Sequence, residues 1–428
     1  MPLRLIVLPV VAFGVIHAQN PASEDARERA RAARELADRG PSAIPELRRL
    51  LQDPVYEVRL EAVKAIVQIG TRDSLDALIE ATRDPDPEIQ IRATDGLVDF
   101  YLPGYVRTGL TATLRRVGKT IKGRFTDVND QVIPLHLEVR ADVIEALGRL
   151  ASGGSTMESR ANAARAVGVL RGRAAVPYLL EAVRSKNSQV IYESLIALQK
   201  IQDPSAAKGI SFLLRDLDDR VQIAAIETTG LLGNKEALPQ LHDVLKTARN
   251  ARVRRAALTA IAMLPDESSR PLYNQYINDK DELMRAAAAE GFGRLRNPDD
   301  IPMLERAFEA EKKMNPRLST AFALVLLGKT ELSEFSPLRY LVNTLNSSSF
   351  HGVATPFLVE AARQTPVRRQ LEAALKGATR LEKIRLAQVL ARSGDAESIP
   401  HLEELARDAD AEVGTEAAAA LRVLRQRL

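Results

Sequence analysis

Cysteine and tryptophan are both absent from this chain of 428 residues. Without cysteine the chain has no disulfide, no thiol nucleophile, no cysteine-ligated metal and no thioether-linked chromophore. Aromatic residues make up only 4% of the sequence, whereas hydrophobic residues make up 45%. This composition favours helices that pack closely through alanine and leucine, rather than a core built around large rings.

Histidine is scarce, and the common catalytic and phosphate-binding motifs are missing. Gly118-Lys119-Thr120 and Gly328-Lys329-Thr330 resemble the end of a phosphate-binding loop, but Thr113 and Ala323 stand where its first glycine belongs. The sequence has no Gly-x-Ser-x-Gly elbow and no His-Glu-x-x-His. We therefore expect no metal and no cofactor, although dispersed catalytic carboxylates remain open. The five histidines are far apart: His17, His136, His242, His351 and His401.

The N-terminus has the layout of a secretory signal peptide, residues 1–18. Arg4 provides the basic start, an apolar run extends from Leu5 to Ile16, and Ala18 offers a cleavage site. We expect the mature chain to begin near Gln19 and to work in the periplasm or outside the cell. The repeats that follow contain no apolar run of about 18 residues, which a spanning helix needs.

A unit of about 31 residues recurs along most of the chain, and a fixed period of this size indicates stacked helix pairs. The marker is a small residue in the second helix of each unit. We predict an all-α, right-handed solenoid over residues 42–428, preceded by a capping helix in 19–41. Two segments interrupt the period: an insertion at 103–137 and an irregular loop at 329–350. The marker positions are Ala62, Ala93, Ala163, Ser194, Ala225, Ala257, Ala288, Thr320 and Ala417.

One unit shows the pattern clearly. Pro45 lies in the first turn of the first helix, where its missing N–H has no cost, and Asp53-Pro54 forms an acidic turn. Val58-Arg59 opens the second helix, and Gly70 ends it. We expect the arginine of such Val-Arg pairs to reach the acidic turn of an adjacent unit, which would set the register of the stack.

These residues resemble the HEAT repeat family, in the short form also found in phycobilin-lyase-like proteins. The resemblance is specific for the fold and weak for function, because such repeats serve unrelated roles. Some HEAT-like hydroxylases bind two irons through His-Glu dipeptides in successive repeats. No His-Glu dipeptide occurs in this sequence.

The second helices should line the concave face of the solenoid, and their outward positions carry both signs of charge. A nucleic-acid groove needs one dominant sign, so the mixture favours a protein or peptide ligand over nucleic acid. The candidate partner-binding residues on this face are Glu61, Lys64, Arg92, Asp95, Glu193, Glu227 and Glu290.

The insertion is strongly basic, with six bases and no acid between Gly104 and Thr126. Leu110, Leu114, Val117 and Ile121 fall on one face of a helix. The segment is therefore either an excursion packed on the solenoid or a docking element for an anionic lipid surface or acidic partner. Its bases are Arg107, Arg115, Arg116, Lys119, Lys122 and Arg124.

The leading interpretation is an exported, monomeric, non-catalytic scaffold that binds a protein or peptide. Two alternatives stay open. One is an enzyme or enzyme subunit of the lyase- or hydroxylase-like HEAT kind. The other is an adaptor that docks on an anionic membrane through the basic insertion.

Overall fold

The computed structural model describes residues 21–105 and 132–428, and every regular element in them is a helix. They divide into two compact units, 21–105 with 154–159 and 132–153 with 160–428, here called unit 1 and unit 2. The helices of unit 1 are α1 (Ala26–Leu36), η1 (Ala37–Ala43), α2 (Ile44–Leu50), α3 (Tyr56–Ile69), α4 (Ser74–Ala81) and α5 (Pro87–Tyr101).

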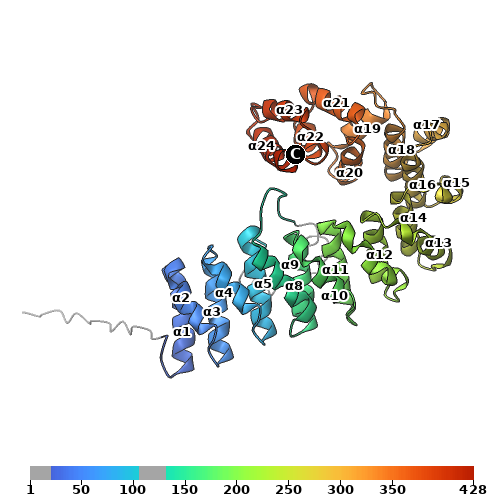
Figure 1. Cartoon of the computed structure of the whole chain (residues 1–428). Helices are drawn as coiled ribbons and strands as arrows, with labels where there is room; N and C mark the ends of the chain where they lie inside the picture. The colour runs from blue at the N-terminus through green and yellow to red at the C-terminus, as the bar shows by residue number, and fades with distance from the viewer. Residues whose placement is uncertain (1–20, 106–131) are drawn as a thin grey trace, which may run out of the picture. The chain divides into compact units, whose positions relative to one another are not determined.

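Unit 2 continues the same alternation of a first and a second helix in each repeat (Figure 1). The first residues of α9, up to Ser159, belong to unit 1. Its helices are α8 (Ala141–Gly153), α9 (Met157–Val169), η2 (Arg173–Ala175), α10 (Val176–Ala182), α11 (Ser188–Ile201), η3 (Pro204–Arg215), α12 (Asp219–Leu231), η4 (Lys235–Ala237), α13 (Leu238–Thr247), α14 (Ala251–Met263), η5 (Glu267–Ser269), α15 (Arg270–Tyr276), α16 (Glu282–Leu295), η6 (Pro298–Asp300), α17 (Ile301–Ala310), α18 (Met314–Leu326), α19 (Pro337–Thr344), α20 (His351–Ala361), α21 (Thr365–Ala374), η7 (Leu375–Gly377), α22 (Arg380–Ser393), α23 (Ser398–Leu405) and α24 (Ala411–Arg427).

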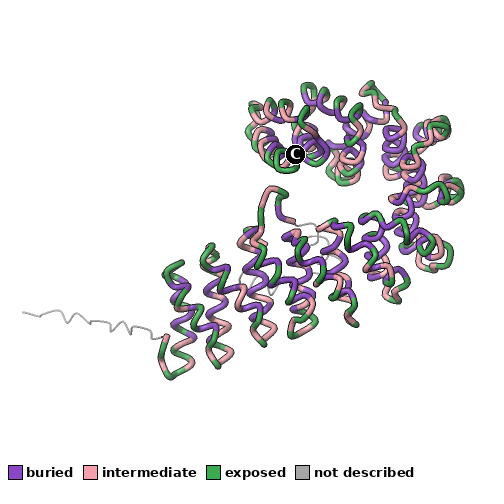
Figure 2. The backbone as a smooth tube through the Cα atoms, viewed as in Figure 1, coloured by how far each residue is buried: buried purple, intermediate pink, exposed green. Residues whose placement is uncertain are grey.

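The predicted α-solenoid and its register are confirmed. All nine marker residues are buried: Thr320 is 3% exposed and the other eight are fully buried. The buried positions run along the facing sides of the two helix layers, and the exposed positions lie on their outer sides (Figure 2). The core is therefore a continuous strip between the layers, as a repeat stack requires.

Basic residues of the second helices fix one repeat to the next, and Arg59 and Arg285 do so as arginines of the predicted Val-Arg type, whereas Arg254 donates to carbonyls of its own turn. In α3, Arg59 donates from Nε to Asp84 Oδ2 at 2.7 Å and from a terminal nitrogen to the Asp53 carbonyl at 3.0 Å. It thus caps its own turn while it holds the next one. A basic side chain also reaches the next turn in Arg29–Asp53 at 2.6 Å, Arg255–Asp281 at 2.5 Å, Arg285–Glu311 at 2.8 Å and Lys383–Asp408 at 2.6 Å.

Glycines in the second helices α9 and α12 allow the following second helix to approach closely. A Cβ on Gly168 would lie 2.7 Å from the Cα of Ala197. On Gly230 it would lie 2.9 Å from the Cα of Ala260. Real Cβ atoms do not come this near to backbone, so these helices touch main chain to main chain.

The expectation of an irregular loop throughout 329–350 is wrong. Helix α19 occupies residues 337–344, with Ser336 as its N-cap and Pro337 in its first turn. Leu338, Leu341 and Val342 are fully buried, so this helix serves as the first helix of its repeat. Irregular chain remains only on either side of it.

Two further expectations concern the N-terminal part of the chain. Helix α1 fills the expected capping segment, and its Arg29 contacts Asp53 as a second helix would. Most of the basic insertion and residues 1–20 lie outside the described residues. Within residues 21–105 and 132–428, no helix is both long enough and apolar enough to cross a bilayer.

Candidate functional site

The second helices of unit 2 offer the best candidate for a functional face. From α12 to α20 they lie on the inner side of the curve of this unit, and α13, α15 and α17 lie on its outer side (Figure 1). We call the surface formed by α11, α12, α14, α16, α18 and α20 the inner face. Its carboxylates decide what it can bind, because most of them already have a basic partner.

Glu193 of α11 is neutralised inside the protein. Its side chain is 1% exposed, and Arg165 of α9 donates to both carboxylate oxygens, at 2.7 and 3.1 Å. The Gln189 amide adds a third donor at 2.7 Å, and Arg220 donates to the amide oxygen of Gln189 at 2.8 Å. Glu193 was expected to face outward. The structure instead makes it the acceptor of a network that ties three second helices together, because a buried carboxylate needs such partners.

Glu290 of α16 is also paired. Arg294, one turn later, donates to it at 3.0 Å, and the Ser319 hydroxyl of α18 donates at 2.9 Å. Arg294 also reaches Glu360 of α20. Both carboxylates of this group therefore already have a donor within the protein.

The candidate residues in unit 1 follow the same pattern. Glu61 lies 3.2 Å from Arg34 and 2.9 Å from Lys64. Arg92 pairs with Glu88 at 2.6 Å. Asp95 is 9% exposed, so it does not project from the surface as expected. Glu61 thus pairs within α3 and with the preceding helix α1, and Arg92 pairs within α5.

Glu227 of α12 differs from these acids. It forms no ion pair with any described residue, and the surrounding protein raises its pKa by desolvation, an effect that a hydrogen bond from Gln199 opposes. The solvent-accessible surface of Glu227 places it among the exposed residues, so water still reaches its side chain even though neighbouring protein atoms partly desolvate the carboxyl group. A carboxyl that is accessible, unpaired and shifted toward neutral pH is the type that can exchange a proton with a ligand.

The neighbours of Glu227 give this site a defined shape. Gln199 of α11 donates to Thr228 Oγ1 at 3.0 Å and to the Ala224 carbonyl at 3.2 Å, so its amide is fixed beside the carboxylate. Leu231, one turn further along α12, is 41% exposed. We call Glu227, Gln199 and Leu231 the Glu227 site. It combines a carboxyl group of raised pKa with an exposed apolar side chain.

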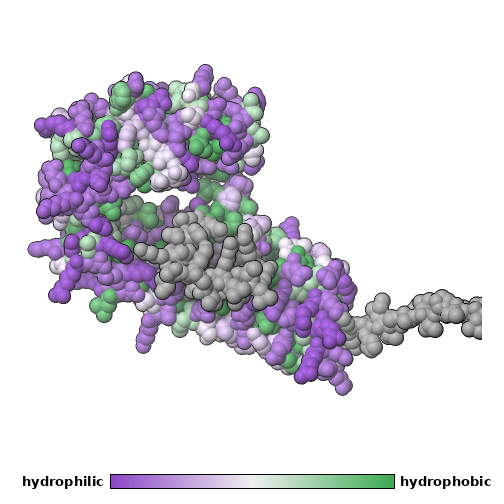
Figure 3. Space-filling model, turned by 180° about the vertical axis from the view of Figure 1, so that it is seen from behind, coloured by the Kyte–Doolittle hydropathy of each residue, from purple (hydrophilic) through white to green (hydrophobic). Residues whose placement is uncertain are grey.

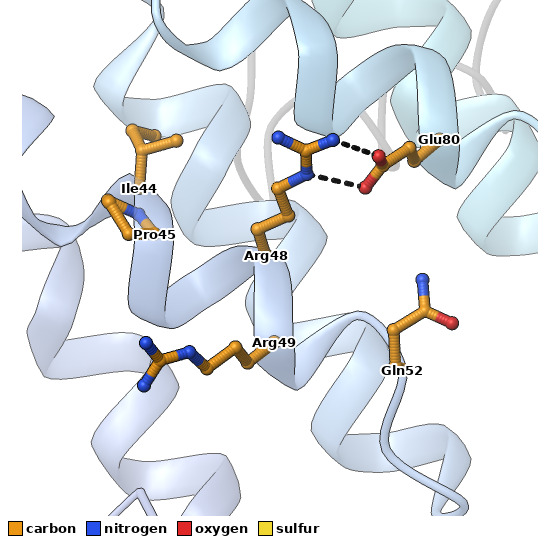
Figure 4. Close-up of a pocket in the computed structure, with 6 residues that line it drawn as sticks. All are labelled: Ile44, Pro45, Arg48, Arg49, Gln52 and Glu80. Carbon is orange, nitrogen blue, oxygen red and sulfur yellow. Dashed lines mark hydrogen bonds and ion pairs between the residues drawn. The ribbon is translucent and has the colours of Figure 1, made fainter.

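A hollow lies on the first-helix side of unit 1, between α2 and α4 (Figure 4). Arg48 closes one wall by a bidentate ion pair with Glu80, with Nε–Oε2 at 2.7 Å. The hollow is open to solvent, and its charged pair is satisfied. We therefore do not assign a site to it. It is lined by Ile44, Pro45, Arg48, Arg49, Gln52 and Glu80.

The side chains in the described part of the chain do not form a metal-binding site. No group of three His, Asp or Glu side chains there is placed to hold an ion. His242 is instead tied to Ser269, with Nε2 and Oγ 2.9 Å apart, and burial lowers its pKa. The whole sequence also lacks the His-Glu dipeptides of the iron-binding HEAT hydroxylases.

The basic insertion cannot be placed with these sites. Arg107, Arg115, Arg116, Lys119, Lys122 and Arg124 all lie outside the described residues. Their role in docking remains a prediction from the sequence. On the side of the molecule seen in Figure 3, hydrophobic residues of the described part lie scattered among hydrophilic ones.

Sequence comparison identifies HEAT repeats in this chain, at residues 18–98, 208–272 and 241–325. A curated relative, the deoxyhypusine hydroxylase of Eremothecium gossypii, is 24% identical over 249 residues. That match covers 57% of this chain and 65% of the relative, so the chain spans a little under two thirds of that protein.

Several solved structures are similar to this chain. The CpcE–CpcF complex of phycocyanin lyase from Nostoc sp. PCC7120 has 18% identity and a TM-score of 0.38, over 62% of this chain and 91% of that one. Human deoxyhypusine hydroxylase in complex with glycerol has 19% identity and a TM-score of 0.27, over 67% of this chain and 97% of that one. An engineered protein has 18% identity and a TM-score of 0.35, over 95% and 97% of the two chains.

The expectation of a non-catalytic scaffold without enzyme activity is overturned by the match to a hydroxylase over more than half of the chain. Local motifs do not reveal this relationship, because the similarity is spread over many repeats. The enzyme alternative therefore replaces the scaffold as the leading interpretation.

Proposed function

From a solenoid of HEAT repeats whose inner face carries Glu227, a carboxyl group without an ion-pair partner among the described residues, we propose that this chain is an enzyme or enzyme subunit of the hydroxylase- or lyase-like HEAT kind. Its substrate is a protein segment held on the inner face. The observation that carries the proposal is the match to deoxyhypusine hydroxylase over 249 residues. The repeat architecture supports the protein substrate, because stacked repeats build extended surfaces for such partners.

The chemistry assigned to this chain is acid–base chemistry at the Glu227 site. The raised pKa of Glu227 suits a group that accepts and returns a proton. Gln199 holds the carboxylate in place, and Leu231 packs against the apolar part of the bound segment. We assign no role to iron, because the chain does not supply the His-Glu dipeptides through which the HEAT hydroxylases bind it.

Export completes the proposal. The signal-peptide layout of residues 1–18 supports a location in the periplasm or outside the cell, and we propose that the enzyme acts there as a monomer. N-terminal sequencing of protein from the native host should then begin at Gln19. Soluble cytoplasmic protein with an intact Met1 would contradict this location.

A photo-crosslinking experiment tests the enzyme proposal. A photoreactive amino acid replaces Leu231 on the inner face, and Lys208, 75% exposed on η3, serves as the matched position on the first-helix layer. Only the first variant should capture the substrate in the native host. Mass spectrometry of that protein should show a covalent modification that is absent from a strain lacking this chain. If the captured protein has the same mass in both strains, the chain binds it without modifying it, and the enzyme proposal is refuted.

A further inference from the structure

One ion pair in unit 2 joins repeats that are not neighbours. In a solenoid each repeat contacts the next one, so side chains rarely reach two repeats along. Arg294 of α16 nevertheless donates to both carboxylate oxygens of Glu360 of α20, each at 2.9 Å. Helix α18 lies between the two helices in the repeat order. The bridge therefore spans the inner face across a whole repeat.

The arginine end of this bridge is firmly held. The Arg294 side chain is 10% exposed and also donates to Glu290 at 3.0 Å. Its guanidinium lies 5.0 Å from the centre of the Phe322 ring on α18. Phe322 in turn stacks on Phe357 of α20, with ring centres 4.4 Å apart. Arg294 thus passes over the aromatic pair that joins α18 to α20.

The glutamate end is weaker. Glu360 is 33% exposed, whereas Glu290 is 13% exposed and has the Ser319 hydroxyl as a second donor. If Glu360 leaves, water can solvate its carboxylate, and Arg294 keeps both Glu290 and the Phe322 ring. The pair can therefore open at Glu360 without leaving an uncompensated buried charge.

Beside Arg294, the backbones of α16 and α18 touch. A Cβ on Gly293 would lie 2.5 Å from the Cα of Ala323, which makes this the tightest of the glycine contacts between successive second helices. This contact fixes α16 against α18. Helix α20 is joined to α18 through the stack of Phe322 on Phe357, so the position of α20 on α18 is what the ion pair can set.

We propose that Arg294 and Glu360 form a curvature latch on the inner face. When the pair is closed, it holds α16, α18 and α20 in a bent arc. When it opens, α20 shifts on α18, and the inner face widens to admit a protein segment. The latch does not depend on catalysis, so it stands or falls separately from the enzyme proposal.

Distance measurements between spin labels test the latch. The chain has no cysteine, so Asp299→Cys and Arg363→Cys, both at exposed positions beyond the ends of α16 and α20, accept labels specifically. In this background Glu360→Ala should shift the distance distribution to longer values and broaden it. Glu290→Ala removes the neighbouring partner of Arg294 and keeps the latch, so its distribution should match the background.

Two results would overturn the latch. One is an unchanged distribution in Glu360→Ala, and the other is an equal shift in Glu360→Ala and Glu290→Ala, which would indicate general loosening around Arg294. Circular dichroism and thermal unfolding of each variant check that the fold is retained. Neither measurement involves enzyme activity.

Discussion

Arg59 in one repeat and Asp84 in the turn of the next form a single structural joint, with Nε and Oδ2 2.7 Å apart and side chains 14% and 7% exposed. Because the same guanidinium also donates to the Asp53 carbonyl of its own turn, it fixes two turns at once. The hydrogen bonds raise the pKa of Arg59, which therefore remains charged at any working pH. This joint recurs along the chain and gives the stack its spacing.

Removing this joint should destabilise the protein more than removing an exposed ion pair does. Arg59→Met should lower the free energy of unfolding by about 1.5–3 kcal/mol, the usual range for a hydrogen bond to a charged group. The control is Arg48→Met, which loses a bridge to Glu80 with side chains 49% and 32% exposed. Its effect should stay below about 1 kcal/mol. Parallel urea titrations measure both, and equal losses would contradict the role assigned to Arg59.

The close approach of second helices can be tested at Gly230. Gly230→Ala should cost about 1–3 kcal/mol, because its Cβ would lie 2.9 Å from the Cα of Ala260 and the helices must move apart. Gly377→Ala meets nothing within 4 Å and should be neutral or slightly stabilising. If thermal unfolding shows no loss for Gly230→Ala, the helices are not in main-chain contact.

The shifted pKa of Glu227 predicts a pH-dependent effect on stability. Desolvation raises the pKa in the folded state, so the folded protein binds a proton more tightly than the unfolded chain. Stability is therefore lost as pH rises from the ordinary glutamate pKa, about 4.3, through the raised value. Glu227→Gln cannot ionise and should be more stable than wild type at neutral pH.

This gain should disappear near pH 4, roughly the ordinary glutamate pKa, where the wild-type carboxyl is largely protonated. Glu309→Gln, at an exposed position of α17, is the matched control and should show no such trend. Melting temperatures at both pH values measure the effect. A wild-type protein more stable than Glu227→Gln at neutral pH would show that the carboxylate has a stabilising partner.

If the basic insertion docks on a membrane, the protein should bind anionic liposomes. Changing Arg115, Arg116, Lys119 and Lys122 together to Gln should then remove most binding, since each base contributes about 1 kcal/mol. Raising the salt concentration should have the same effect on wild type. If the segment packs on the solenoid instead, Leu114→Asp should lower the melting temperature, and cosedimentation should show no lipid binding to lose.

The repeat register could be predicted from the sequence, because a small residue is required wherever second helices press together. Ala62, Ala225 and Ala288 are fully buried for this reason. Helix α19 was missed because Leu338, Leu341 and Val342 form too short a pattern beside the polar run that starts at Asn346. A helix of eight residues depends on burial by its neighbours, which a local pattern does not show.

The functional face was harder to predict, because basic side chains from other repeats determine whether a carboxylate is neutralised or available to a ligand. Glu193 and Glu227 both look like outward acids of second helices, yet Arg165, 28 residues earlier, neutralises only Glu193. Arg317 shows the same limit. It occupies the Val-Arg position of α18 but lies 5.0 Å from the Phe308 ring and 4.9 Å from the Tyr340 ring. Which partner such an arginine contacts depends on residues in other repeats.

The most direct test of the account separates binding from chemistry at Glu227. The photoreactive residue at position 231 is combined with Glu227→Gln in the native host, and the mass of the captured protein is compared with that from the otherwise wild-type chain. The account predicts that capture persists, because the inner face is intact, and that the captured protein lacks the covalent modification. Full modification by the Glu227→Gln chain would contradict the central claim that this carboxyl group performs the chemistry.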